Sequence, residues 1–261
     1  MRRSWAAWSC FLLLSACASV STEPSGGLGA YGPSGGLADG KGLRAKGKLW
    51  VDHDALMAAR TLRIQPIELS AEAAAAITPE QREIVRSAVG RSLCKQLGKR
   101  FEIAPADAPA DLAVHVVVSK LGLTDPRASA TSMVVGVVSP IRVPVGLGSL
   151  TVEGEARDMD GKQKAVLVWA RGADVFTTGA RVSSVGDAYQ MAGAFSDDFA
   201  RLLSRGEDPF RRRRLREHDG RPDRKPVEGE CDAYGHAPGV RGALVDRLGL
   251  PPEWADRKAN P

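Results

Sequence analysis

Two strand-like runs joined by an Asp-Gly turn constrain the fold of this chain more than any other stretch. Residues 150–157 (LTVEGEAR) and 163–171 (QKAVLVWAR) are rich in β-branched and apolar residues, and five residues lie between them. This connection contains Asp160 and Gly161, and glycine supplies the positive φ that a tight turn with a bulge requires. The pattern predicts an antiparallel β-hairpin.

One face of the first hairpin strand carries two glutamates, Glu153 and Glu155, between Thr151 and Arg157. Side chains two residues apart lie on the same face of a strand. General acid work needs a desolvated or charge-coupled carboxyl group, and nothing in the local sequence indicates one here. We therefore expect these glutamates to be solvated charges.

Further strands and two helices are predicted from periodicity and capping. Residues 61–69 alternate apolar and polar side chains around Pro66, which favours an edge or a bulge, and residues 110–119 are apolar on both faces, as in a central strand. Thr78 and Gln81 form a capping box that starts a helix ending near residue 99. A second helix begins near Asp187, with an apolar stripe formed by Ala188, Ala192, Phe195, Phe199 and Leu202.

These elements predict an α+β domain over residues 49–205. We expect a two-layer sandwich: a mainly antiparallel sheet of about four or five strands with two main helices on one face, and disordered ends. A domain of this size buries enough surface to fold without a staple.

The N-terminus predicts export and a lipid anchor. Residues 1–16 combine Arg2 and Arg3 with a short apolar run, which is typical of a signal peptide. The run closes on Leu14-Ser15-Ala16-Cys17, which resembles the bacterial lipobox. That resemblance implies cleavage before Cys17 and a diacylglyceryl group on its thiol, so the membrane is the first expected partner.

Residues 17–48 and 206–261 are predicted to lie outside the domain. The first range is glycine-rich and repeats Pro-Ser-Gly-Gly-Leu, so we expect a flexible tether spanning on the order of 30 Å. The second is expected to be a charged, largely disordered tail. Its arginines offer contacts for an anionic ligand, or else are a solvated run: Arg211, Arg212, Arg213, Arg214 and Arg216. Residues 133–147 are valine-rich and interrupted by Gly and Pro. We expect either a buried crossover or irregular strand, or an exposed apolar loop that meets a partner or lipid.

Two cysteines are left once the signal peptide and the lipid site are set aside. Cys10 leaves with the signal and Cys17 is acylated, so Cys94 and Cys231 remain. Export permits a disulfide between them, and two free thiols are the alternative.

Composition and motifs exclude several functions. The net charge of +5 includes Arg2 and Arg3, so the mature side chains carry 5 − 2 = +3, too little to indicate nucleic-acid binding. The sequence has no phosphate loop, HExxH or paired-Cys motif, so we expect no metal, no cofactor and no enzyme activity. The histidines are scattered: His53, His115, His218 and His236.

Several short motifs resemble a family of uncharacterised bacterial envelope lipoproteins, known as domain of unknown function 3313. The motifs are Ser25-Gly26-Gly27-Leu28-Gly29-Ala30-Tyr31, Leu49-Trp50-Val51-Asp52, Ile64-Gln65-Pro66-Ile67, the stretch 152–158 and Gly186-Asp187-Ala188. The family favours an aromatic residue at the position of Gly27 and an aspartate at that of Ala30. The resemblance implies an envelope location and the α+β fold, but no catalytic residue.

The resulting hypothesis is a non-enzymatic lipoprotein of the Gram-negative envelope with a structural or assembly role. Ala18 is not the aspartate that commonly retains lipoproteins in the inner membrane, so we expect the periplasmic face of the outer membrane. The alternative is a binding module for an envelope lipid or glycan. In either case the partner is an unidentified envelope protein, lipid or glycan.

Overall fold

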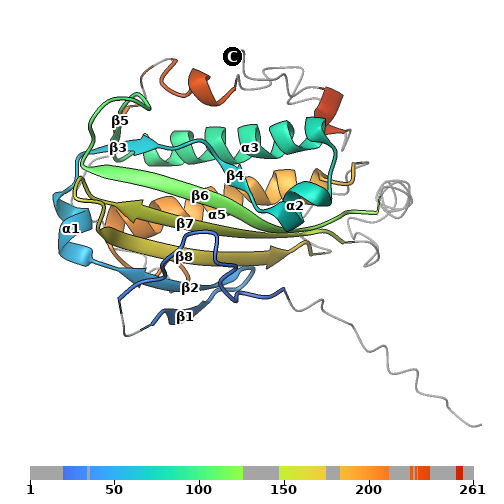
Figure 1. Cartoon of the computed structure of the whole chain (residues 1–261), viewed down its shortest axis with the longest axis horizontal. Coiled ribbons are helices and arrows are strands. Elements are labelled where there is room, and N and C mark those ends of the chain that lie inside the picture. Colours follow the sequence, from blue (N-terminus) through green and yellow to red (C-terminus); the bar gives the residue numbers. More distant parts are fainter. Residues whose placement is uncertain are drawn as a thin grey trace, which may run out of the picture.

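The computed structural model describes residues 20–33, 36–125, 147–174, 183–211, 224–225, 227, 229–235 and 251–254. The described residues form one eight-stranded sheet, with helices packed on one face (Figure 1). The strands are β1 Ala38–Lys41, β2 Lys46–Val51, β3 Thr61–Ile64, β4 Glu68–Leu69, β5 Glu102–Ile103, β6 Leu112–Gly122, β7 Ser149–Arg157 and β8 Gln163–Gly172. The α-helices are α1 His53–Ala58, α2 Ala71–Ala75, α3 Pro79–Leu97 and α5 Gly186–Arg205.

The sheet is mixed, in the order β1-β2-β8-β7-β6-β3-β5, with β4 also paired to β6. The adjacent strands β1, β2, β8, β7 and β6 pair antiparallel. Strands β3 and β4 run parallel to β6, and β5 runs parallel to β3. The α+β class is confirmed. The predicted four or five strands are too few, because β1, β4 and β5 are short and carry little periodic signal. The expected single strand over 61–69 is interrupted at Pro66, which separates β3 from β4.

The two long helices, α3 and α5, pack against each other and cover one face of the sheet (Figure 1). The capping box predicted for α3 is present, with Thr78 and Gln81 each accepting from the other's backbone N–H. Asp187 does not cap α5: the N-cap residue is Val185, and the buried Asp187 carboxylate instead accepts the N–H of Gly148 at 2.7 Å. The helix ends at Gly206, whose φ of 63° terminates it in the left-handed region.

Aromatic side chains fill the space between α5 and the sheet. Trp169 on β8 meets Phe195 edge to face at 5.8 Å, and Phe195 stacks on Phe199 at 5.6 Å. Gly154 on β7 makes room for this pair, because a Cβ there would lie 3.0 Å from the Phe199 ring. The stripe predicted for the second helix is therefore confirmed as core packing.

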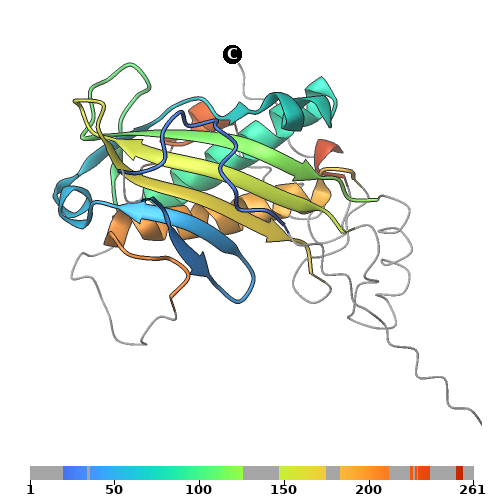
Figure 2. The ribbon, with the colours of Figure 1, turned by 60° about the horizontal axis from the view of Figure 1, so that its bottom comes forward.

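The N-terminal stretch is part of the fold. Residues 38–41 and 46–51 form β1 and β2, and residues 25–33, with 36 and 37, cross the sheet on the face opposite the helices (Figure 2). We call residues 25–33 and 36–37 the N-terminal strap. The prediction of a flexible tether over 17–48 is wrong for these residues, because side chains far along the sequence bind them. The expected two-layer sandwich of a sheet and helices is therefore incomplete, because the strap covers the second face of the sheet.

Part of the C-terminal stretch is also held to the domain. Residues 224–225, 227 and 229–235 form what we call the C-terminal clasp. A disulfide joins Cys231 to Cys94 of α3, with an S–S distance of 2.07 Å, and Arg224 pairs with Glu230 at 2.7 Å. The Arg224 N–H also donates to the Lys99 carbonyl at 2.7 Å. The expected disordered tail is thus wrong for the clasp, since a covalent bond and a partly buried ion pair add to the little apolar surface that it packs on the core.

Candidate functional site

The face of the sheet beneath the N-terminal strap is the candidate functional site. Leu28 of the strap is 5% exposed and packs on Val117 of β6 and Val166 of β8. Gly27 lies so close to the sheet that a Cβ there would come within 3.1 Å of the Val117 side chain. The strap therefore seals a small second core on the face away from the helices.

A fully buried carboxylate, Glu153, fixes the start of the strap. It accepts the Ser25 N–H at 2.7 Å and the hydroxyl hydrogen of Tyr31. The Tyr31 oxygen in turn accepts the N–H groups of Gly26 at 2.9 Å and Leu28 at 3.3 Å. Burial, followed by the hydrogen bond to Glu153, raises the pKa of Tyr31, so the phenol stays protonated and keeps donating.

The end of the strap is held by the side chain of Gln163 at the start of β8. Its amide oxygen accepts the Gly32 N–H at 2.7 Å, and its amide nitrogen donates to the Ala30 carbonyl at 3.0 Å. The same nitrogen also donates to Glu155. One amide therefore connects the strap to the second buried glutamate.

Glu155 lies at the centre of a charged cluster on this face. Its oxygens meet the Nδ1 atom of His115 at 3.4 Å and the guanidinium of Arg157 at 2.8 Å. Burial raises the pKa of Glu155, but hydrogen bonds from His115, Arg157 and Gln163 outweigh it and the net direction is down. The pKa of His115 is raised, chiefly by its bond to Glu155 and despite burial, with Glu68 adding attraction from 3.3 Å.

The prediction that Glu153 and Glu155 are solvated is therefore wrong. Their side chains alternate outward from the helix layer as expected, but the strap covers them and leaves them 0% and 2% exposed. The cluster contains a His and two carboxylates, yet its hydrogen bonds are made within the fold. In the described part of the chain, no group of three or more His, Cys, Asp or Glu side chains is placed to hold a metal ion.

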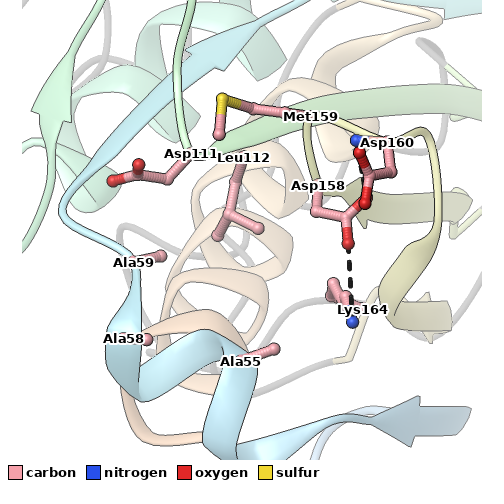
Figure 3. Close-up of a pocket in the computed structure, with 9 residues that line it drawn as sticks. All are labelled: Ala55, Ala58, Ala59, Asp111, Leu112, Asp158, Met159, Asp160 and Lys164. Atoms are coloured by element: carbon pink, nitrogen blue, oxygen red, sulfur yellow. Dashed lines mark hydrogen bonds and ion pairs between the residues drawn. The ribbon is translucent and has the colours of Figure 1, made fainter.

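A second candidate site is a hollow of about 310 Å³ where α1 approaches the β7–β8 turn (Figure 3). Asp158 and Asp160 of the turn and Asp111 before β6 border it, and Lys164 lies 3.5 Å from Asp158. Asp111 already accepts the N–H groups of Arg60 and Thr61, and these bonds lower its pKa. The Asp158 carboxylate likewise accepts the backbone N–H groups of Asp160 and Lys162. These acidic groups serve to shape the turn and the strand start.

The residues singled out from the sequence lie apart. Cys94 and Cys231 are bonded behind α3, and Arg211 lies exposed just beyond α5. Cys17, Arg212, Arg213, Arg214 and Arg216 lie outside the described residues, as do residues 133–146. The strap contacts were missed because Glu153 and Ser25 stand 128 positions apart. One available signal was the family motif beginning at Ser25, which contains both Leu28 and Tyr31.

Most of the described domain matches a known protein family. Residues 25–199 match the model of the family described as "Protein of unknown function (DUF3313)". The chain belongs to this family. The match begins at Ser25, the first strap residue bound by Glu153, so the DUF3313 region includes the strap as well as the sheet and helices. No curated protein matches the sequence.

The chain also has low similarity to several solved structures of bacterial proteins. A PelC dodecamer from Paraburkholderia phytofirmans has a TM-score of 0.39 and 14% identity, over 61% of this chain and 97% of that one. Protein XCC0632 from Xanthomonas campestris, a DUF330 protein, has a TM-score of 0.32 and 11% identity, over 60% and 91%. A DUF4136 family protein (BT2437) from Bacteroides thetaiotaomicron has a TM-score of 0.30 and 14% identity, over 63% and 99%.

Proposed function

We propose that this DUF3313 protein is a non-enzymatic lipoprotein with a structural or assembly role in the Gram-negative envelope. A diacylglyceryl group on Cys17 holds it at the periplasmic face of the outer membrane. The observation that carries the proposal is the sequence Leu14-Ser15-Ala16-Cys17 directly behind a short apolar run. Two or more acyl chains, at about 0.8 kcal/mol per buried CH₂, anchor a protein stably without a membrane-spanning segment.

Two features of the fold support this proposal: the Cys94–Cys231 disulfide and the pairing of its acidic groups. The Cys94–Cys231 disulfide is typical of proteins in an oxidising compartment such as the periplasm. In the part of the chain that the structure describes, no helix is long and apolar enough to cross a bilayer. The acidic groups of the strap face and of the hollow beside α1 already have partners within the fold, which favours a binding or scaffold role over catalysis.

The distance from the anchor to the domain is short. Eight residues lead from Cys17 to Ser25, and a fully extended chain spans about 3.3–3.6 Å per residue, so Ser25 lies within roughly 29 Å of Cys17. Because the strap is fixed to the sheet from Ser25 onward, the lipidated domain is kept close to the leaflet. A partner that it assembles with must therefore lie at or near the same membrane surface.

The test replaces Cys17 and uses the other signal-region cysteine as a matched control. Cys17→Ala should lose incorporation of labelled palmitate and accumulate as the unprocessed precursor. Cys10→Ala should be lipidated and processed like the unmodified chain, because Cys10 leaves with the signal peptide. Separating inner and outer membranes on a density gradient then gives the location. Normal processing and membrane fractionation of Cys17→Ala would refute the proposal.

The structural or assembly role is tested by crosslinking the lipidated chain in living cells and identifying the partners by mass spectrometry. We expect a defined envelope protein with the lipidated chain and its loss with Cys17→Ala. Recovery of the same partner with the unlipidated variant would contradict a role that depends on the anchor.

A further inference from the structure

We propose that the turn between β1 and β2 is a second membrane contact, which inserts Leu43 among anionic lipid headgroups beside the anchor. This inference rests on the proposed anchor at Cys17 and goes beyond it, because it assigns the face of the domain that meets the bilayer. The turn (residues 42–45) carries a large apolar side chain that is almost fully exposed to solvent, since Leu43 is 98% exposed. An exposed leucine at a hairpin tip loses nothing by entering lipid and has no packing role in the domain.

Three basic side chains surround Leu43. Lys41 and Arg44 are exposed and Lys46 is half-buried, so the tip carries a local charge of +3. None of the three forms an ion pair with any other residue that the structure describes. A leucine ringed by unpaired cations is suited to a lipid surface, where the apolar group enters and the cations meet phosphates.

The start of the described chain lies beside this turn. Val20 borders the same hollow, of about 220 Å³, as Lys41, Leu43 and Arg44, and its side chain reaches 3.4 Å from the position that a Cβ on Gly172 would occupy. Figure 2 shows the blue start of the described chain next to the end of β8, toward the sheet edge that carries β1 and β2. Val20 is three positions after Cys17, a span of at most about 11 Å when the chain is fully extended. The acyl chains on Cys17 therefore enter the bilayer within that distance of the hollow, which places the turn at the headgroups.

The turn is held in one position by an aromatic residue that follows α5. The ring of Phe210 packs against Gly40, Gly42 and Gly47, and a Cβ at Gly40 would lie 2.3 Å from it. A Cβ at Gly47 would also meet the Val168 carbonyl at 2.6 Å. These glycines let the hairpin lie flat on the ring, so that its tip projects as a fixed feature. Arg211 follows this ring directly and is exposed, which adds one more positive charge at the same edge.

The opposite end of the sheet provides a matched control. Met159, in the β7–β8 turn, is 76% exposed, but Asp158 and Asp160 flank it in place of lysine and arginine. The registers Lys46↔Ala170 and Arg157↔Gln163 place the two turns at opposite ends of the sheet. A domain tethered at Cys17 brings the first turn to the bilayer and keeps the second away from it.

The test labels each turn in the lipidated full-length chain. In the mature form the native cysteines are removed, acylated or disulfide-bonded, so Leu43→Cys and Met159→Cys each provide one reactive thiol for an environment-sensitive fluorophore. The proteins are reconstituted into vesicles of phosphatidylcholine and phosphatidylglycerol whose acyl chains carry bromine as a quencher. We expect loss of most of the fluorescence at position 43 and little loss at position 159. Equal quenching at both positions, or none at position 43, would overturn the inference.

The same vesicles distinguish the contribution of the basic side chains from that of the lipid anchor. Combining Lys41→Gln, Arg44→Gln and Lys46→Gln should weaken insertion of the labelled turn by roughly fivefold per residue in anionic vesicles. Unchanged quenching in this variant would rule out anionic headgroups as the ligand. Flotation of the vesicles reports the anchor: a chain that floats without quenching at position 43 refutes only the turn contact. A chain that does not float refutes the anchor, and the turn contact with it.

Discussion

The two ends of this chain reach the domain by different means, although both look like disordered sequence. The N-terminal strap is glycine-rich and lies on the outer face of the sheet, held by hydrogen bonds to the buried side chains of Glu153 and Gln163. The C-terminal clasp is charged and lies against α3, held by the Cys94–Cys231 disulfide and the Arg224–Glu230 pair. One end is attached reversibly and the other covalently, which means that different conditions release them.

The difference follows from the position of each end relative to the proposed anchor. The strap begins eight positions after Cys17, the proposed lipid site, so a pull on that anchor would be transmitted to Glu153 and the sheet. The clasp follows a charged stretch with few apolar groups and lies against a helix that already has its core on the other side. A covalent bond compensates for the small apolar surface that such a segment can bury.

Removing the disulfide should have the largest effect on stability. Cys94→Ala combined with Cys231→Ala should lower the free energy of unfolding by about 2–5 kcal/mol, because the bond closes a separation of 137 residues. Urea denaturation measures the loss, and dithiothreitol should bring the unmodified protein to the same midpoint. A midpoint insensitive to both treatments would show that the clasp contributes nothing to the domain.

Neutralising the strap carboxylate should have a smaller and more local effect. Glu153→Gln keeps the shape of the side chain but replaces one acceptor oxygen by a donor facing Ser25 or Tyr31, at a cost of about 1.5–3 kcal/mol for a bond to a charged group. We expect faster amide hydrogen exchange and easier proteolysis in residues 25–32, with the clasp unchanged.

The matched control for this variant is Glu72→Gln. Its side chain is 70% exposed and only 4.0 Å from Lys120, so exchange in the strap should stay as in the unmodified protein. If both variants loosen the strap equally, or neither does, Glu153 is not what holds it.

Local signals in the sequence predicted the central elements well. The capping box at Thr78 and Gln81 and the turn glycine Gly161, with φ of 76°, depend only on neighbours within a few residues. The hairpin, the buried central strand and both long helices therefore lie within a few residues of where the periodicity put them. The parallel pairing of β3, β4 and β5 was not predictable in this way, because those strands are short and α2 and α3 lie between them and most of their partners along the chain.

The candidate site could not be predicted from local patterns for the same physical reason. Glu153 and Glu155 alternate along a strand as solvent-exposed charges do, and nothing near them in sequence reveals a cover. Their burial comes from Ser25, Leu28 and Tyr31, which lie more than 120 positions away in a glycine-rich stretch. Composition describes how a segment behaves alone, and here the binding side chains belong to another part of the chain.

The smallest predicted effect is a pH dependence confined to the strap side of the sheet. The pKa of His115 is raised above 6.5 in the folded protein by Glu155 first and by Glu68 as well, so the folded state binds the proton more tightly than the unfolded state does. This stabilisation is complete below pH 6.5 and is lost as the pH rises through the folded pKa.

His115→Gln should therefore abolish the part of the decline in stability above pH 6.5 that comes from this histidine. Glu68→Gln leaves Glu155 in place and should only make that part of the decline smaller. Urea midpoints measured between about pH 5.5 and pH 9 for the three proteins test this, and parallel curves would contradict it. Because the disulfide of the clasp does not titrate, the protection of amides from hydrogen exchange, corrected for the intrinsic rate at each pH, should change in the strap and stay constant in residues 229–235. This difference separates the two attachments within one experiment.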